Sequence, residues 1–377
     1  MIDFPPFLQN LYLRFYEYPL FIQIALVVSA ISFATFLLTN IVMSLQRLEY
    51  SFLETRLVKL RKIVTGEITF KLMLKDRVVD HDIDGVVRRF NKIAITNKLV
   101  KQVITEELIY LRRNFSGYTS TVLAKLYNRL NFMESSISKL ESRSWDVQAE
   151  GLREFQELPV PTEDIALINP LLNDKNDDVR IEAQAAYIRL NSHNPFKFLD
   201  SATEELLEWH QIILFEMIIN TPRADIPAFS KWLDSDNISV IIFSTKLIVH
   251  YQQLEAIPNI IKLLDHDDEN VKEIAIYAVG QLGAEESEQK LIAIFQESDL
   301  PIKVKILEAI GNIGSGKSER FLTDQYLMAE EFSLIKTAGC ALGNQPGFDG
   351  DKFSAIHTLS LKQKTILSHC LNSLIRN

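Results

Sequence analysis

The feature that most constrains this chain is a repeat with a period near 31 residues in its second half. An acidic or Asn-rich turn recurs there, each time followed by a branched apolar residue that opens a helix. These apolar anchors are Val147, Val179, Val240, Val271, Ile302 and Leu334. Their spacings are 32, 61, 31, 31 and 32 residues, and because 61 is two periods, a missing anchor is expected near Trp209. Six such periods, closed by a capping helix from about Leu361, predict a stacked repeat array.

Each unit is predicted to be two helices joined by a turn. The Asp-rich turns (NDKNDD, DSDN, DHDDEN) can supply side-chain oxygens to the free N–H groups of the second helix. Small residues recur at matching positions of the second helices, where they let a neighbouring helix approach closely: Ala186, Ala278, Ala309 and Ala341. One helix pair cannot bury its own apolar stripe. The predicted fold class is therefore all-α, with an α-solenoid of helical hairpins over residues 145–377.

Three segments carry a resemblance to a known family: LLNDKNDDVRIEAQAAYIRL (171–190), LLDHDDENVKEIAIYAVGQLG (263–283) and IKVKILEAIGNIG (302–314). They resemble the HEAT repeat family in its short bacterial form, also called HEAT-like or PBS-lyase-like. The resemblance implies a scaffold and does not identify the partner, since such repeats bind many unrelated proteins. The layout also resembles single-pass HEAT proteins of Bacteroidota-type bacteria, which implies work beside envelope or surface-polysaccharide enzymes.

A long apolar run precedes the repeats. Residues 20–45 contain no Asp, Glu, Lys, Arg, His, Pro or Gly. About 20 apolar residues are enough for a helix to cross a bilayer. A secretory signal would have a positive start and a shorter apolar core, and here only Arg14 is basic upstream. The run therefore predicts a transmembrane helix, after a short non-cytoplasmic N-terminus at residues 1–19.

Basic residues are concentrated after the apolar run. Because Lys and Arg stay on the cytoplasmic side, we expect a single pass through the inner membrane, with the N-terminus outside and the repeats in the cytoplasm. The flanking basic residues would also face anionic lipid headgroups. They are Arg47, Arg56, Lys59, Arg61 and Lys62.

Residues 46–144 form a basic juxtamembrane region that is expected to be mostly helical. Helices are predicted near 84–113 and 118–141, with a break in the second near Ser135, whereas residues 66–80 lack a clean helical stripe and could be extended. Asp80, Asp82, Asp84 and Gly85 resemble the start of a calcium loop. The twelfth position of that loop is Asn91 instead of a bidentate Glu, so a helix start rich in Asp is the favoured interpretation, with ion binding left open.

Charge narrows the class of partner. The formal net charge is −1 over residues 1–45, +8 over 46–145 and −16 over 146–377, which together give −9. An acidic body repels phosphates, which argues against nucleic-acid binding, and it favours a protein partner with a basic patch. Candidate contact positions on the second helices are Glu182, Arg189, Lys246, Lys272, Lys305 and Lys336, although for each one taken singly an ordinary solvated side chain is the favoured interpretation.

Gly311 to Ser318 match the phosphate-loop pattern G-x-x-x-x-G-K-S. That chemistry needs a buried strand before the loop, and here a helical stripe precedes it. Gly280 and Gly283 lie one period before Gly311 and Gly314, so the glycines are expected to end helices, where a left-handed residue is needed. No catalytic residues, cofactor, metal ligands or small-molecule substrate are predicted.

Cys340 and Cys370 are the two cysteines of the chain. They are predicted to be neither a disulfide framework nor a metal site, and to fit a reducing compartment, with Cys340 acting as a small core residue.

Three functions follow in order of preference. The first is a membrane-anchored interaction scaffold, the second a lyase-type enzyme or accessory protein, and the third an intracellular regulatory sensor.

Overall fold

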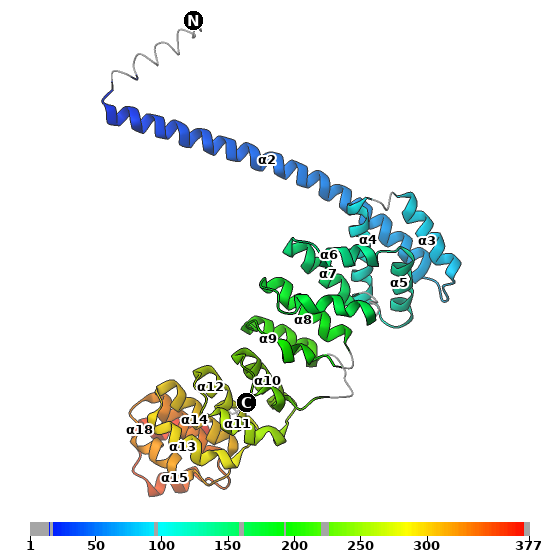
Figure 1. Ribbon diagram of the computed structural model, residues 1–377. Coiled ribbons are helices and arrows are strands. Elements are labelled where there is room, and N and C mark those ends of the chain that lie inside the picture. Colours follow the sequence, from blue (N-terminus) through cyan, green and yellow to red (C-terminus); the bar gives the residue numbers. More distant parts are fainter. Residues whose placement is uncertain are drawn as a thin grey trace. The chain divides into compact units, whose positions relative to one another are not determined.

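The computed structural model describes residues 15, 18–93, 97–157, 162–191, 194–219 and 226–372. Every regular element within these residues is a helix (Figure 1), which confirms the predicted all-α class. The predicted N-terminal segment 1–19 lies almost wholly outside the described residues. The chain forms two compact units, Met1–Met133 and Glu134–Asn377.

The first unit begins with one helix of 49 residues, α2 (Leu20–Ile68). Its part from Leu20 to Arg47 contains an 18-residue window with a mean hydropathy of 2.3, none of which is buried against the protein. By length and composition this part could cross a membrane. The same helix continues without a break into the core of the unit, where Val64 and Ile68 are fully buried.

The interpretation of residues 66–80 as extended is wrong for residues 66–73. The helix runs to Ile68 and passes into a π-helical turn, η1 (Thr69–Met73). Val64, Ile68 and Leu72 are spaced by four residues and all are buried, so they form one continuous helical face. This apolar helical face was not recognised within residues 66–80 because its first residue, Val64, lies before them.

Three further helices complete this unit: α3 (Asp80–Lys92), α4 (Lys98–Asn114) and α5 (Tyr118–Arg129). The predicted helix 84–113 is thus two helices, and the Asn97 side chain caps the second by accepting from the Leu99 N–H at 2.9 Å. The predicted helix 118–141 is also divided. Its break is at Asn131 and not near Ser135, because Asn131 adopts a left-handed conformation (φ 54°) that a short polar side chain tolerates.

The second unit is the predicted array of hairpins. Its first elements are α6 (Met133–Leu140), η2 (Thr162–Leu171), η3 (Lys197–Ser201), η4 (Phe229–Trp232), α11 (Ile257–Leu263), α13 (Glu288–Glu297), α15 (Glu319–Met328) and α17 (Gly350–Ile356). Short turns η5 (Leu254–Ala256) and η6 (Glu285–Ser287) precede α11 and α13. The second helices are α7 (Trp145–Glu157), α8 (Asp177–Leu190), α9 (Glu208–Ile219), α10 (Ile238–His250), α12 (Glu269–Gln281), α14 (Leu300–Ile313), α16 (Phe332–Gly343) and α18 (Leu361–Leu371). The predicted capping helix is α18. α6 belongs to this unit, although the sequence placed the start of the repeats at residue 145.

The Asp- and Asn-rich turns cap the second helices as expected. Asn176, Asn237, Asp268 and Asp299 each accept hydrogen bonds from backbone N–H groups in the first turn of α8, α10, α12 and α14. These bonds satisfy N–H groups that have no partner inside the helix. Each turn therefore fixes where its second helix starts.

The missing anchor is His210, one residue after the expected position. His210 is fully buried at the start of α9, whereas Trp209 is 44% exposed. The interval from Val179 to His210 is 31 residues. The apolar pattern skips this unit because a histidine occupies the anchor position.

The glycines have two separate roles. Gly283 (φ 64°) and Gly314 (φ 60°) are left-handed, as predicted for helix ends. Gly280 and Gly311 instead lie within helices, where an added Cβ would come within 2.8 Å of the Cα atoms of Ala309 and Ala341. The prediction was wrong for this second pair, because close approach of neighbouring second helices requires them.

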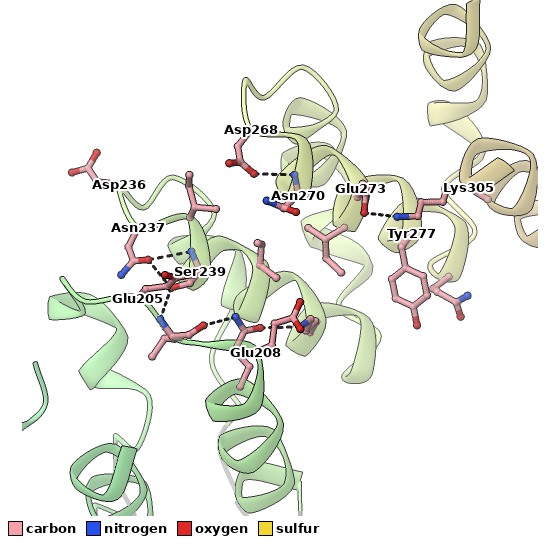
Figure 2. Close-up of a pocket in the computed structure, with 18 of the residues that line it drawn as sticks. Glu205, Glu208, Asp236, Asn237, Ser239, Asp268, Asn270, Glu273, Tyr277 and Lys305 are labelled. Atoms are coloured by element: carbon pink, nitrogen blue, oxygen red, sulfur yellow. Dashed lines mark hydrogen bonds and ion pairs between the residues drawn. The ribbon is translucent and has the colours of Figure 1, made fainter. Parts of the chain in front are cut away.

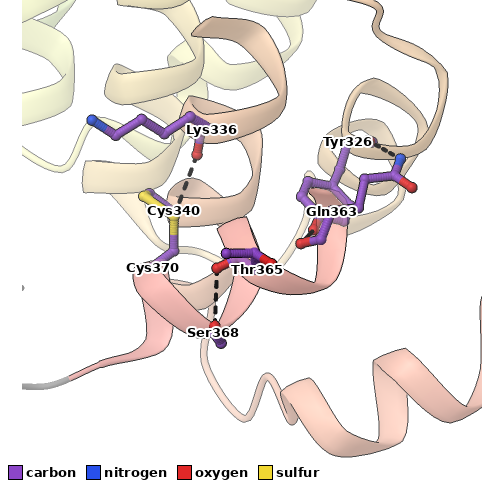
Figure 3. Close-up of a disulfide and its surroundings, with 7 residues drawn as sticks. All are labelled: Tyr326, Lys336, Cys340, Gln363, Thr365, Ser368 and Cys370. Atoms are coloured by element: carbon purple, nitrogen blue, oxygen red, sulfur yellow. Dashed lines mark hydrogen bonds between the residues drawn. A yellow bond between two sulfur atoms is a disulfide. The ribbon is translucent and has the colours of Figure 1, made fainter. Parts of the chain in front are cut away.

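Cys340 and Cys370 form a disulfide that joins α16 to α18 (Figure 3), with Cα atoms 4.8 Å apart. The prediction that the two cysteines do not form a disulfide is therefore wrong. Their separation of 30 residues is almost one repeat, so stacking places them on neighbouring helices. Close by, the buried Tyr326 hydroxyl donates to the Gln363 carbonyl at 2.5 Å, and burial raises the pKa of Tyr326 to about 12.

Candidate partner-binding groove

A groove of about 920 Å³ runs over α9, α10, α12 and α14 of the second unit (Figure 2). Two further hollows adjoin it. One shares Lys246 and Tyr277 with the groove and extends along α9, and the other shares Glu308 and Asn312 and reaches α16. We call this continuous surface the second-helix groove.

The repeat places the lining side chains in two rows. The position two residues after each anchor is occupied by Ile212, Ile242, Glu273, Val304 and Lys336. The position six residues after each anchor is occupied by Glu216, Lys246, Tyr277, Glu308 and Cys340. Two positions four residues apart lie on one face of a helix. The same face of five successive second helices therefore lines the groove.

The groove around α9 to α14 is acidic. Its charged lining comprises six carboxylates and two lysines, a formal net charge of −4: Glu205, Glu208, Asp236, Asp268, Glu273, Glu308, Lys246 and Lys305. Both lysines are engaged within the protein. Lys305 pairs with Glu273, and Lys246 Nζ donates to Gln211 Oε1 at 2.8 Å. Burial lowers the pKa of Lys246, and the charge of Glu208 opposes that shift.

Three of the six predicted contact residues line the second-helix groove: Lys246, Lys305 and Lys336. Glu182 instead accepts from Arg153 of the preceding second helix at 2.7 Å, and Arg189 pairs with Glu157 at 3.0 Å. Lys272 is half-buried and lies outside the groove lining. Charged pairs one repeat apart thus tie α7 to α8, just as Glu273 and Lys305 tie α12 to α14.

Several lining residues were not predicted from the sequence, namely the carboxylates Glu205, Glu208, Asp236 and Glu308, and also Tyr277. A signal for two of them was present, since Tyr277 and Glu308 are both six residues after an anchor. Using it would have required knowing which face of the second helix points outward. The loop residues Glu205 and Asp236 precede their helices and share no such register.

The phosphate-loop pattern has a helix where a nucleotide site needs a strand, because α14 runs directly into Gly314. Lys317 Nζ pairs with Glu285 at 2.7 Å, which raises the pKa of Lys317. The Ser318 hydroxyl is buried and donates to Glu288. These contacts join neighbouring repeats, which supports the structural interpretation of the motif.

The Asp80 to Asp84 segment forms the first turn of α3, as favoured from the sequence. Asp82 accepts from the Val79 N–H at 3.1 Å and pairs with Lys75 at 2.5 Å, a bond that lowers the pKa of Asp82. Arg129 pairs with Asp84 at 3.1 Å. The side chains with calcium-loop spacing therefore contact cations of the protein itself.

The basic flank lies on α2. Arg61 pairs with Glu106 of α4, so its charge is used within the first unit. Lys59 and Lys62 are 12 and 15 residues beyond Arg47, or about 18 to 22 Å along a helix axis. A helix perpendicular to the membrane would therefore place Arg47 nearest to the headgroups, ahead of Arg56.

Comparison with known proteins agrees with this geometry. Residues 226–311 match the HEAT repeats family. Over these residues the chain consists of HEAT-like repeats. No curated protein matches it in sequence. The matched segment contains α10, α12 and most of α14, so three of the helices that line the second-helix groove lie within recognisable HEAT repeats.

Several solved repeat proteins are also similar in structure. One is YibA of Escherichia coli, with 15% identity and a TM-score of 0.38 over 70% of this chain and 97% of that one. Another is the CpcE–CpcF complex of phycocyanin lyase from Nostoc, with 15% identity and a TM-score of 0.25 over 72% of this chain and 94% of that one. A designed armadillo repeat protein in complex with the peptide (KR)4 is 19% identical with a TM-score of 0.26, and the match covers 64% of this chain and 99% of that one. At these identities and TM-scores the likenesses support no assignment of substrate or partner.

Proposed function

We propose that this HEAT-like protein is a membrane-anchored scaffold that holds a protein partner in the second-helix groove. The observation that carries the proposal is the groove itself, where one face of five successive second helices lies open. Repeat arrays use such extended surfaces for binding. The family resemblance of the layout implies a partner in an envelope or surface-polysaccharide complex.

We place the anchor at Leu20–Arg47, with the repeats on the cytoplasmic side. The unbroken course of α2 from this apolar part into the buried core of the first unit supports a retained anchor over a removable signal. The orientation rests on the excess of Lys and Arg after the apolar run. The lyase-type alternative receives no support from Lys317, which pairs with Glu285.

A photo-crosslinking amino acid in place of Tyr277 tests the scaffold proposal. Tyr277 is 50% exposed and lines the groove, so its replacement preserves the fold. We expect ultraviolet light to produce one discrete crosslinked product in cells. The matched control is the same substitution at Ala293, an exposed residue of first helix α13, which should give no such product. Equal products from both positions, or none from Tyr277, would contradict the proposal.

A further inference from the structure

Helix α9 buries Leu214 and Ile218, as a surface helix normally does, but it also buries two polar side chains and exposes several apolar ones. Its sequence is EWHQIILFEMII. His210 and Gln211 are buried, whereas Ile212 is 61% exposed, Trp209 44% and Ile219 37%. Exposed apolar side chains gathered on one helix are typical of a surface that binds another molecule.

Ile212 and Ile219 border a hollow of about 820 Å³ that is continuous with the groove. Ile212, Phe215 and Ile219 line it from α9, and Val249 and Tyr277 line it from α10 and α12. The hollow is therefore an apolar pocket built from three successive second helices. It can accept aliphatic or aromatic side chains.

Negative charge lies directly beside the apolar hollow. Glu208 and Glu308 are exposed, and neither has an ion pair within the part of the chain that the structure describes. Figure 2 shows Glu205 and Asp236 toward one end of the groove, the paired Glu273 and Lys305 toward the other, and Glu208 between them. The surface thus offers an apolar area and unpaired carboxylates side by side.

We infer that the second-helix groove takes an amphipathic segment of a partner protein, with aliphatic or aromatic side chains on one side and Lys or Arg on the other. This inference rests on the proposed scaffold function and specifies the partner. Basic side chains would pair with Glu208 and Glu308, while apolar ones would enter the hollow beside Ile212. The same carboxylates would repel anionic lipid headgroups, which disfavours a membrane surface as the occupant.

The size of the groove sets the length of the segment. Packed helices lie about 8 to 10 Å apart, so the width from α9 to α14 is about 24 to 30 Å. A bound helix of about 16 to 20 residues spans that distance. A suitable probe is therefore a fluorescein-labelled peptide of about 18 residues, with leucine on one helical face and lysine on the other.

The test measures fluorescence anisotropy of this probe with the full-length protein in phosphatidylcholine nanodiscs, after subtraction of binding to empty nanodiscs. We expect saturable binding that weakens as ionic strength rises from about 0.05 to 0.5 M. Glu208→Lys combined with Glu308→Lys should weaken binding about ten-fold, and Ile212→Ser about three-fold. A peptide with glutamate in place of lysine should not bind.

Matched controls lie outside the groove. Ile356→Ser changes a residue that is 77% exposed on α17, and Glu297→Lys reverses an exposed charge at the end of α13. Both should leave the affinity unchanged. Circular dichroism checks that all variants remain folded.

Besides a failure of the peptide to bind, three results would overturn the inference. The first is equal weakening by groove and control variants. The second is binding that requires anionic lipid in the nanodisc. The third is self-association of the protein that Ile212→Ser abolishes, which would assign the groove to a second copy, whose residues 46–145 carry a net charge of +8. A crosslinked partner at Tyr277 together with no peptide binding would leave the scaffold proposal standing and reject the amphipathic segment.

Discussion

Gly280 and Gly311 set how closely neighbouring second helices approach. Each lies where an added Cβ would contact the Cα atom of the next repeat's alanine at 2.8 Å. Backbone atoms cannot move aside as the end of a flexible side chain can. At these two positions the absence of a side chain is therefore a packing requirement.

Replacing Gly311 with valine should lower the free energy of unfolding by about 1 to 3 kcal/mol, because the new side chain overfills the contact with Ala341. Urea denaturation followed by circular dichroism measures the change. Asn312→Val is the matched control, since Asn312 is the exposed next residue of the same helix. Similar losses for the two variants would show that valine's helix propensity, and not the interhelix contact, is responsible.

His210 is a titratable group in the core of the repeat array. It is fully buried, and neither ring nitrogen has a hydrogen-bond partner among the described residues. Burial lowers the pKa of His210 below the usual 6.5, and the Arg180 charge adds to this effect, while Asp177 and Asp178 oppose it. The folded protein therefore keeps this ring neutral at a pH where the unfolded chain protonates it.

This pKa shift predicts a loss of stability in mild acid. The unfolded chain binds a proton near pH 6.5 and the folded chain resists it, so the free energy of unfolding falls as the pH drops below that value. His210→Leu should reduce the difference in unfolding free energy between about pH 7.5 and pH 5. His369→Gln, at an exposed position, should preserve the difference. An unchanged pH dependence in His210→Leu would assign the effect to other groups.

At the scale of helices, two features indicate opposite compartments for the repeats. One is the disulfide between α16 and α18, and the other is the set of basic residues that follow the apolar part of α2. Disulfides persist where the surroundings are oxidising, whereas the Lys and Arg residues after the apolar run favour the cytoplasm. Stacking by one repeat brings Cys340 next to Cys370 in either case. The compartment then determines whether the pair is a dithiol or a disulfide.

The proposed orientation predicts that the pair is reduced in growing cells. Acid quenching followed by alkylation with a polyethylene glycol maleimide should therefore add two labels per chain. Cys340→Ser should add one label, which calibrates the shift in gel mobility. A wild-type chain that takes up label only after treatment with a reductant would place the repeats on the oxidising side and reverse the orientation.

For the whole molecule, local signals predicted the fold well. The anchors, the caps such as Asn176 and Asp268, and the left-handed Gly283 all depend on residues within a few positions of one another along the chain. The groove was predicted only in part, because lining residues such as Glu205 come from different repeats and lie on loops without a fixed register. The disulfide could have been predicted from its spacing, since 30 residues is nearly one repeat.

The unbroken course of α2 also has a mechanical consequence. The helix continues for 21 residues beyond Arg47, or about 30 Å, and its far end is held in the core of the first unit by Val64 and Ile68. A continuous helix resists twisting much more than a flexible linker does. In the proposed membrane-anchored arrangement, rotation of the apolar part about its own axis would turn the first unit with it, and the length of α2 would set a minimum distance between that unit and the lipid.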